Sequence, residues 1–138
     1  ELDVTVLVPA SMEDQITERN ASAIRAPIIL EPANEGITPA GLSTLEQDGK
    51  QIWTSIASGP GGVTASFLEW SRNRGPRSHA VDLSLDLEHV HTELDRIMKR
   101  IAQRVVAKSQ ANNCTLTEAA YILALTGIAK KLETKHPY

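Results

Sequence analysis

The chain has 138 residues, of which 41% are hydrophobic and 22% charged, and this composition excludes an intrinsically disordered protein. With a formal net charge of −3 and scattered lysines and arginines, we expect neither nucleic acid nor a membrane as a partner. No apolar run is long enough to cross a bilayer. The single cysteine, Cys114, cannot form an internal disulfide and favours a reducing, cytoplasmic location.

Three short β-branched segments in the first part of the chain predict strands. They are VTVLV at 4–8, PIILE at 27–31 and QIWTSIA at 51–57. Their continuous apolar character is typical of strands that are buried on both faces of a parallel sheet. Between them the sequence predicts helices at 13–25 and at 38–49, which gives an alternating strand–helix order.

The second of these helices has clear boundary residues. Thr38 can cap it, Pro39 suits its first position and Gly49 suits its end. The alternating order predicts right-handed crossovers and an α/β fold with a partial, Rossmann-like parallel sheet of about three strands.

After residue 62 the sequence predicts only helices, so we expect a helical carboxyl-terminal tail. VTASFLEWSRN at 63–73 is the first helix, and Arg-Gly-Pro at 74–76 ends it. The second helix, at 87–108, carries apolar residues at helical spacing, namely Leu87, Val90, Leu94, Ile97, Ile101 and Val105.

The last helix, at 115–135, begins with the capping-box pattern of Thr115 and Glu118. Trp53 and Trp70 are interpreted as packing residues, because large aromatic side chains dominate the energetics of protein cores.

Small or conformationally special residues follow each predicted strand. They are Pro-Ala-Ser at 9–11, Pro-Ala-Asn at 32–34 and Ser-Gly-Pro-Gly-Gly at 58–62. Open parallel sheets bind ligands at the edge where their strands end, although such residues are also common in ordinary turns. Three such strand ends favour a ligand site. The Gly-Pro-Gly-Gly segment predicts a turn that either reverses the chain or lets its backbone approach a ligand.

These segments carry a resemblance to a known family. VLVPASMEDQITERNA at 6–21, EPANEGITPA at 31–40 and GGVTASFLEW at 61–70 resemble, in this order, the nucleotide-binding domain of glutamate dehydrogenases. More broadly, they resemble the Glu/Leu/Phe/Val amino-acid dehydrogenase family. The segment at 115–133 resembles the family's carboxyl-terminal helix.

The resemblance implies a division of the chain and roles for particular residues. Residues 1–75 would be the second half of a Rossmann-like nucleotide-binding domain, and residues 76–138 a carboxyl-terminal helical segment. The implied positions that bind the cofactor, NAD or NADP, are Ala10, Ser11, Asn34, Gly59, Gly61 and Gly62, and those that face the amino-acid substrate are Val63 and Ser66.

The Ser66 hydroxyl could donate a hydrogen bond to the side-chain carboxylate of a dicarboxylic substrate. The alternative for this residue is an ordinary serine on a helix surface.

Three positions depart from the family pattern along this edge. Pro32 removes a backbone donor, Glu35 introduces an acid, and Gly59 stands where the family has an asparagine that holds the carboxamide. No G-x-G-x-x-G motif follows a strand, and the family's catalytic lysine and aspartate would lie upstream. We therefore assign no residue of this chain to catalysis or to metal binding.

Two functions stay open. The first is a carboxyl-terminal fragment or truncated homologue of an NAD(P)-dependent glutamate-type dehydrogenase, which converts glutamate to 2-oxoglutarate, with no activity in isolation. The second is a non-catalytic binding or assembly module derived from such a domain, which the three departures favour. A bare strand edge and an apolar helical tail predict either a homo-oligomer or association with a missing amino-terminal half.

Overall fold

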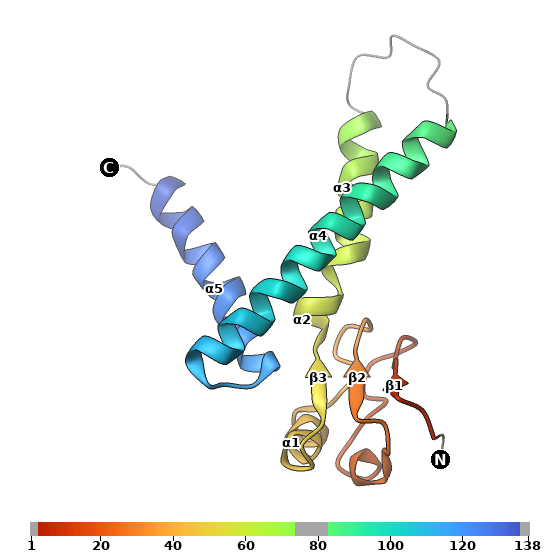
Figure 1. The fold of residues 1–138 in the computed structure, drawn as a ribbon, viewed down its shortest axis with the longest axis vertical. Coiled ribbons are helices and arrows are strands. Elements are labelled where there is room, and N and C mark those ends of the chain that lie inside the picture. The colour runs from red at the N-terminus through yellow and green to blue at the C-terminus, as the bar shows by residue number, and fades with distance from the viewer. Residues whose placement is uncertain (1–2, 74–82, 136–138) are drawn as a thin grey trace.

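The computed structural model describes residues 3–73 and 83–135. In this part of the chain a small sheet comes first and long helices follow it (Figure 1). The elements are β1 (Val6–Leu7), the 3₁₀ helix η1 (Ala21–Ala23), β2 (Ile28–Leu30), α1 (Pro39–Gln47), β3 (Gln51–Trp53), α2 (Ser55–Ser58), α3 (Pro60–Asn73), α4 (Leu83–Asn112) and α5 (Leu116–Lys135). The predicted helix stop at 74–76 and the proposed boundary after residue 75 lie outside these described residues.

The three strands form one open parallel sheet in the order β1–β2–β3. Val6 pairs with Ile28, and Ile29 pairs with Ile52, so each strand lies beside its neighbour in the sequence. In Figure 1 all three strands point toward the side of the sheet from which α2 and α3 rise. The predicted partial Rossmann-like sheet, followed by a helical tail, is confirmed.

The sheet part of the chain has its own aliphatic core. Ile29 of β2 and Leu45 of α1 are fully buried, and Ile52 of β3 is nearly so. They pack with Ala21 of η1 and with Ile16 and Ile37, which lie between the named helices and strands. Pairing satisfies the backbone groups of the strands, and side chains such as Ile29 and Ile52 leave water. The prediction that the strands are buried on both faces was wrong, because Val6 of β1 and Leu30 of β2 are exposed.

The boundaries of α1 are as the sequence predicted. The Thr38 hydroxyl accepts a hydrogen bond from the Gly41 N–H at 3.1 Å, and Pro39 is the first helical residue. Gly49, just beyond the end, has a φ of 71°, which glycine adopts without strain. Gly41 lets α1 lie close to the chain before it, because a Cβ there would be 2.7 Å from the Ile16 carbonyl oxygen.

The prediction of a helix at 13–25 was wrong, since only the three residues of η1 form a helical turn there. The Asp14 N–H instead donates to the Glu35 carbonyl at 2.9 Å, which joins this segment to the loop after β2. The Asn20 side-chain oxygen accepts from the Thr17 N–H at 2.8 Å. Such local side-chain bonds compete with helical hydrogen bonding.

The prediction of a turn at Gly-Pro-Gly-Gly was also wrong, because the chain is helical through this segment. The third strand ends at Trp53 instead of continuing to residue 57, and α2 follows at once. Gly59 has helical angles (φ −71°, ψ −25°), and α3 starts at Pro60, three residues earlier than predicted. A Cβ at Gly59 would be 2.6 Å from the Ser55 carbonyl oxygen. The lack of a side chain at Gly59 therefore lets α2 continue directly into α3.

The helical part packs around smaller side chains. Ala57 of α2, Val105 of α4 and two alanines of α5 are buried together, with Trp53 against them. The capping box of α5 is confirmed, since the Thr115 N–H donates to the Glu118 carboxylate at 2.9 Å and the Glu118 N–H donates to the Thr115 hydroxyl at 3.1 Å. Trp53 packs as predicted, but the prediction for Trp70 was wrong, because this side chain is 53% exposed.

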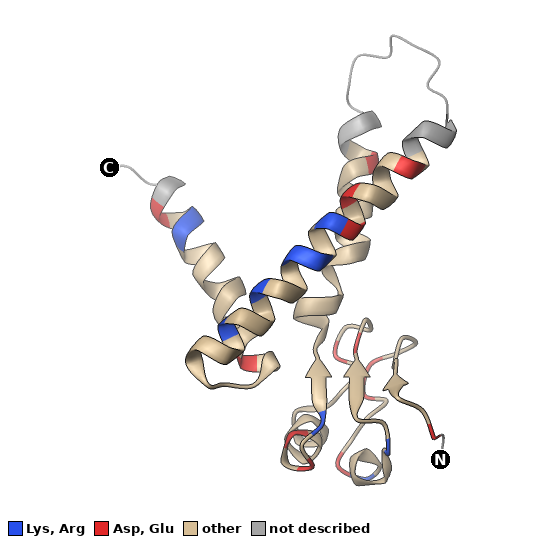
Figure 2. Cartoon of the chain, in the orientation of Figure 1, with Lys and Arg blue, Asp and Glu red and all other residues tan. Residues whose placement is uncertain are grey.

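Acidic and basic side chains are mixed along the long helices. Figure 2 shows both signs following one another on α4, where Arg96 pairs with Glu93 at 2.6 Å and Lys99 pairs with Asp95 at 2.8 Å. Among the helices that the structure describes, none is both long and apolar enough to span a membrane.

Candidate functional site

The carboxyl ends of the three strands are tied to one another. The Ala33 N–H, after β2, donates to the Pro9 carbonyl, after β1, at 3.4 Å. The Glu31 N–H donates to the Trp53 carbonyl of β3 at 2.9 Å. The edge at which the sequence predicts a ligand is therefore one continuous border of the sheet (Figure 1).

A pocket of about 550 Å³ opens at this border between the loop after β2 and the start of α3. Three of the sequence-predicted residues line it together: Asn34 from the loop, Gly59 between α2 and α3, and Val63 on α3. The Asn34 amide is exposed and offers both a hydrogen-bond donor and an acceptor. The pocket's volume lies in the range that small ligands occupy in proteins.

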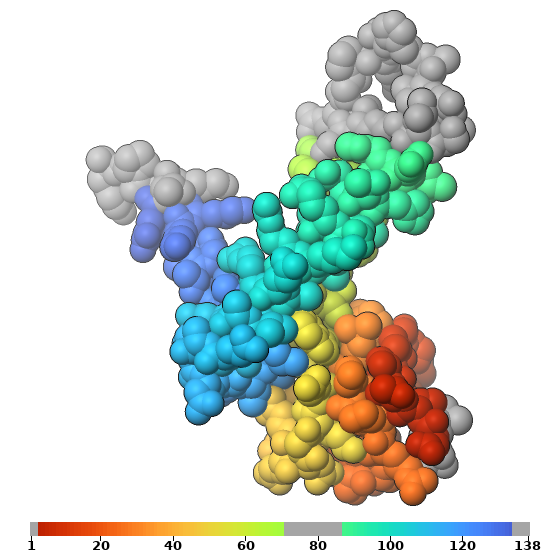
Figure 3. Space-filling model, viewed as in Figure 1, coloured from red at the N-terminus to blue at the C-terminus, as the bar shows by residue number. Residues whose placement is uncertain are grey.

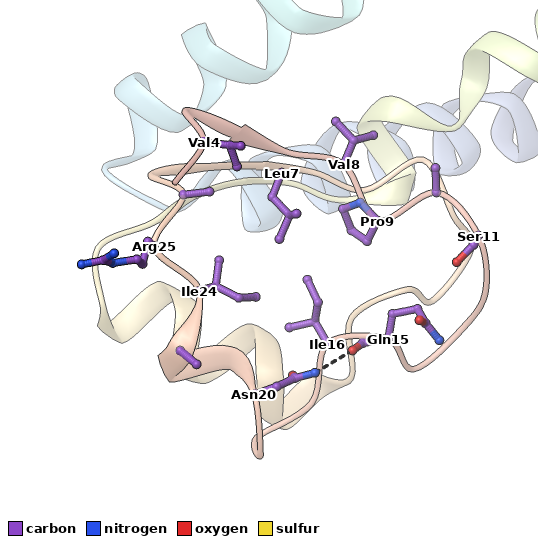
Figure 4. Close-up of a pocket in the computed structure, with 13 residues that line it drawn as sticks. Val4, Leu7, Val8, Pro9, Ser11, Gln15, Ile16, Asn20, Ile24 and Arg25 are labelled. Carbon is purple, nitrogen blue, oxygen red and sulfur yellow. Dashed lines mark hydrogen bonds between the residues drawn. The ribbon is translucent and has the colours of Figure 1, made fainter. Parts of the chain in front are cut away.

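Ala10 and Ser11 line a different hollow, of about 660 Å³, beside β1. Figure 4 shows Leu7, Ile16 and Ile24 pointing into this space, with Ser11 at one end of it. The Asn20 side-chain N–H donates to the Gln15 carbonyl at 2.9 Å on its rim. Of the predicted cofactor positions, Ala10 and Ser11 thus line one hollow, and Asn34 and Gly59 line another.

The remaining predicted residues lie along α3. Gly61 faces α4, since a Cβ there would be 3.6 Å from the Met98 sulfur, whereas a Cβ at Gly62 would meet nothing within 4 Å. Ser66 is exposed on the helix surface, three residues after Val63 and hence on a neighbouring position of the same face. The side chain of Val63 itself is 74% exposed.

Sequence reasoning missed Glu31, which follows β2 directly. It is only 4% exposed, yet it is an acid. Its carboxylate accepts hydrogen bonds from the backbone N–H groups of Ile37 at 2.8 Å and Ser55 at 2.9 Å. The signal was present in the sequence, because a charged residue that closes a buried apolar strand must have bonding partners nearby.

Two of the three departures from the family pattern line this pocket, and the third directly follows Asn34. Pro32 and Gly59 line it, and Glu35 follows Asn34 with a φ of 53°, in the left-handed region. A residue other than glycine is strained in this backbone conformation.

The described residues contain no group of three or more potential metal ligands. The pKa of Glu93 lies below its ordinary value because its carboxylate is hydrogen-bonded to Arg96. This pair lies on α4, with Arg96 exposed and Glu93 half-buried, and it lines neither hollow. The chemistry that the site offers is accordingly hydrogen bonding and shape, supplied by backbone groups and the Asn34 amide.

Comparison with known proteins agrees with the resemblance. A family profile described as glutamate/leucine/phenylalanine/valine dehydrogenase matches residues 1–135. The chain is 35% identical, over 97% of its length, to the NADP-specific glutamate dehydrogenase of Synechocystis sp., of which it covers 30%. It is 34% identical, again over 97% of its length, to the NAD-specific glutamate dehydrogenase A of Halobacterium salinarum, of which it covers 29%.

A solved structure has the same fold. It is the hetero-hexameric glutamate dehydrogenase of Thermus thermophilus in a leucine-bound form, with a TM-score of 0.85 and 25% sequence identity. The match covers 99% of this chain and 32% of that one. The chain thus spans about 30% of the length of the relatives it matches. It belongs to the glutamate/leucine/phenylalanine/valine dehydrogenase family.

Proposed function

We propose that this chain supplies one wall of the cofactor cleft of a glutamate-type amino-acid dehydrogenase. In this proposal residues 1–75 are the second half of the nucleotide-binding domain and residues 76–138 are its helical tail. The observation that carries the proposal is that Asn34, Gly59 and Val63, from two separate motifs, line one pocket at the carboxyl edge of the sheet.

The proposed ligand of the pocket is the nicotinamide end of NAD or NADP. The Asn34 amide would bond to polar groups of this ligand, while the exposed start of α3 would leave room for its flat ring. The relatives support both cofactors, since one is NADP-specific and another NAD-specific. Ala10, Ser11, Gly61 and Gly62 would contribute at the margins of the cleft.

The proposed substrate is glutamate, which the complete enzyme would deaminate oxidatively to 2-oxoglutarate. Ser66 and Val63 would face it from α3, and the Ser66 hydroxyl would bond to the substrate's side-chain carboxylate. The facing wall, the phosphate-binding turn and the groups that move protons would come from residues outside this sequence. We therefore expect no turnover from the chain alone.

A non-catalytic binding or assembly module is the second candidate. The departures at Pro32, Glu35 and Gly59 favour it, because Pro32 and Gly59 line the pocket and Glu35 directly follows Asn34. Under this proposal the chain keeps its surfaces and has lost nucleotide affinity.

Both candidates include a partner, either further copies of the chain or a separate amino-terminal half. β1 has no strand on its outer side among the described residues, and it lies at the margin of the molecule in Figure 3. Large apolar side chains are also exposed on α5, including Leu125, Ile128 and Leu132. Unpaired strand edges and exposed apolar faces both favour association.

The deciding experiment is a chimaera in which this chain replaces the matching segment of the Synechocystis sp. relative. We expect glutamate-dependent reduction of NADP⁺ by the chimaera and none by the chain alone. In the chimaera, Ser66→Ala should raise the KM for glutamate about tenfold, because one hydrogen bond to a charged group is lost. A folded chimaera that neither binds nor reduces NADP⁺ would instead establish the module.

A further inference from the structure

We propose that Glu31 is a positioning residue that sets the width of the pocket between Asn34 and the start of α3. This inference rests on the proposed function of that pocket, although the hydrogen bonds on which it depends do not. Glu31 lies at the end of β2, beneath the pocket, and does not line it.

Both carboxylate oxygens of Glu31 are used, and each holds a different side of the pocket. Oε1 accepts from the Ile37 N–H at 2.8 Å and so closes the loop whose exposed part carries Asn34. Oε2 accepts from the Ser55 N–H at 2.9 Å, at the first residue of α2. Since α2 passes through Gly59 directly into α3, this second bond fixes the other side.

The backbone groups of Glu31 complete the arrangement. Its N–H donates to the Trp53 carbonyl of β3 at 2.9 Å, and its carbonyl accepts from the Ser58 hydroxyl near the end of α2. One buried residue thus connects β2, β3, α2 and the loop after β2. Because every polar group of Glu31 has a partner, its burial does not leave an unsatisfied charge.

Only a carboxylate can perform this task. Two backbone N–H donors face the side chain, and a carboxylate is an acceptor at both of its oxygens. A glutamine of nearly the same shape would present one oxygen and one NH₂ group. Its NH₂ would meet a backbone donor, so either the loop of Asn34 or the start of α2 would lose its attachment.

Glu35 provides a matched control for the loss of charge. It lies in the same loop and is exposed. The Ile37 and Ser55 N–H groups donate to the Glu31 carboxylate and not to that of Glu35. Glu31→Gln and Glu35→Gln therefore remove the same charge at neighbouring places, but only the first removes the two attachments.

The test uses the full chain, labelled with ¹⁵N, and with ¹³C at the glutamate carboxyl carbons. In the wild-type chain we expect scalar couplings across the hydrogen bonds from the Ile37 and Ser55 nitrogens to the Glu31 carboxyl carbon. In Glu31→Gln, amide exchange at Ile37 or Ser55 should accelerate at least about tenfold while that of Ile29 in the core is unchanged. Glu35→Gln should leave all of these rates unchanged.

Absence of either coupling in the wild-type chain would overturn the inference, and this arm does not depend on whether a variant folds. Equal acceleration of all amides in Glu31→Gln would also overturn it, because Glu31 would then stabilise the fold as a whole without positioning the pocket.

A separate arm tests the link to the ligand by titrating millimolar NADP⁺ and following the Asn34 side-chain amide signals. Glu31→Gln should weaken the response about tenfold, whereas Glu18→Gln, at an exposed acid that lines neither hollow, should leave it intact. Equal responses in both variants would overturn the inference. If NADP⁺ changes no chemical shift of the Asn34 amide in the wild-type chain, the proposal that NADP⁺ binds this pocket is rejected. The couplings and exchange rates still decide the role of Glu31 in that case.

Discussion

The sheet part and the helical part of this chain bury their apolar residues very differently. Around the sheet, large aliphatic side chains such as Ile29 and Leu45 are fully buried, and backbone bonds tie the loops together. Along the helices, the buried positions of the described residues are mainly alanine and valine, while large residues such as Phe67 and Leu125 stay exposed. The sheet part thus has an aliphatic core of large side chains, whereas the helical part exposes large apolar side chains that suit a partner.

The largest difference should appear on truncating one aliphatic side chain in each part. Ile29→Ala should lower the free energy of unfolding by about 3 kcal/mol, because it removes buried methylenes and leaves a cavity. Leu125→Ala, at a side chain that is 63% exposed, should change it by less than about 0.5 kcal/mol. Urea unfolding of both variants measures this, and similar losses would contradict the contrast.

Adding a methyl group to a glycine should also have opposite effects in the two parts. Gly41→Ala should destabilise the chain by about 2 kcal/mol, because its Cβ would lie 2.7 Å from the Ile16 carbonyl oxygen. Gly127→Ala on α5 should stabilise it by roughly 0.5–1 kcal/mol, since a Cβ there meets nothing within 4 Å and alanine favours helix. The thermal unfolding midpoints of the two variants measure these effects. A lower midpoint for Gly127→Ala as well would contradict the prediction, because it would mean that α5 is tightly packed at this position.

Relief of the backbone strain at Glu35 should stabilise the chain, by less than the larger change in each comparison above. Glu35 has a φ of 53°, so Glu35→Gly should raise the free energy of unfolding by about 1 kcal/mol. Glu35→Ala is the matched control, because alanine removes the same side chain but keeps the strain. Equal stabilities of the two variants, measured by urea unfolding, would contradict this account of the loop.

The smallest effect should come from the pair of Glu93 and Arg96 on α4. Arg96 lowers the pKa of Glu93 in the folded chain, so the pair stabilises the fold above the ordinary carboxyl pKa. This contribution is lost as the pH falls through the lowered pKa of Glu93. Glu93→Gln should therefore differ slightly from wild type in its urea midpoint at neutral pH and not at all in acid. A difference that grows in acid would contradict the sign.

The sequence was sufficient where local chemistry and burial agree. The aliphatic runs at Ile29 and Ile52 predicted the sheet, and the cap at Thr38 and the capping box at Thr115 predicted helix starts. It failed at 13–25 because that segment bonds across to the loop of Glu35, a contact that local periodicity does not encode. It also misread Gly59, where the absence of a side chain allows close packing against the helical backbone at Ser55.

The candidate site was predictable in part for the same reason. The position of Asn34 at a strand end implied the sheet edge, and the structure places it with Gly59 and Val63. The separation of Ser11 from that pocket follows from the path of the loops, which the sequence pattern does not specify. The acid after an apolar strand indicates that Glu31 needs bonding partners, but the sequence pattern does not identify them as the backbone N–H groups of Ile37 and Ser55.

The most direct measurement is the Kd of NADP⁺ for the chimaera with and without the substitution Asn34→Ala. An amide on the wall of the cleft should contribute about 1.4 kcal/mol, so this variant should bind about tenfold more weakly. Gln103→Ala, which removes an exposed amide from α4, should bind as the unsubstituted chimaera does. Identical Kd values for all three proteins would contradict the assignment of this sheet edge to the dinucleotide.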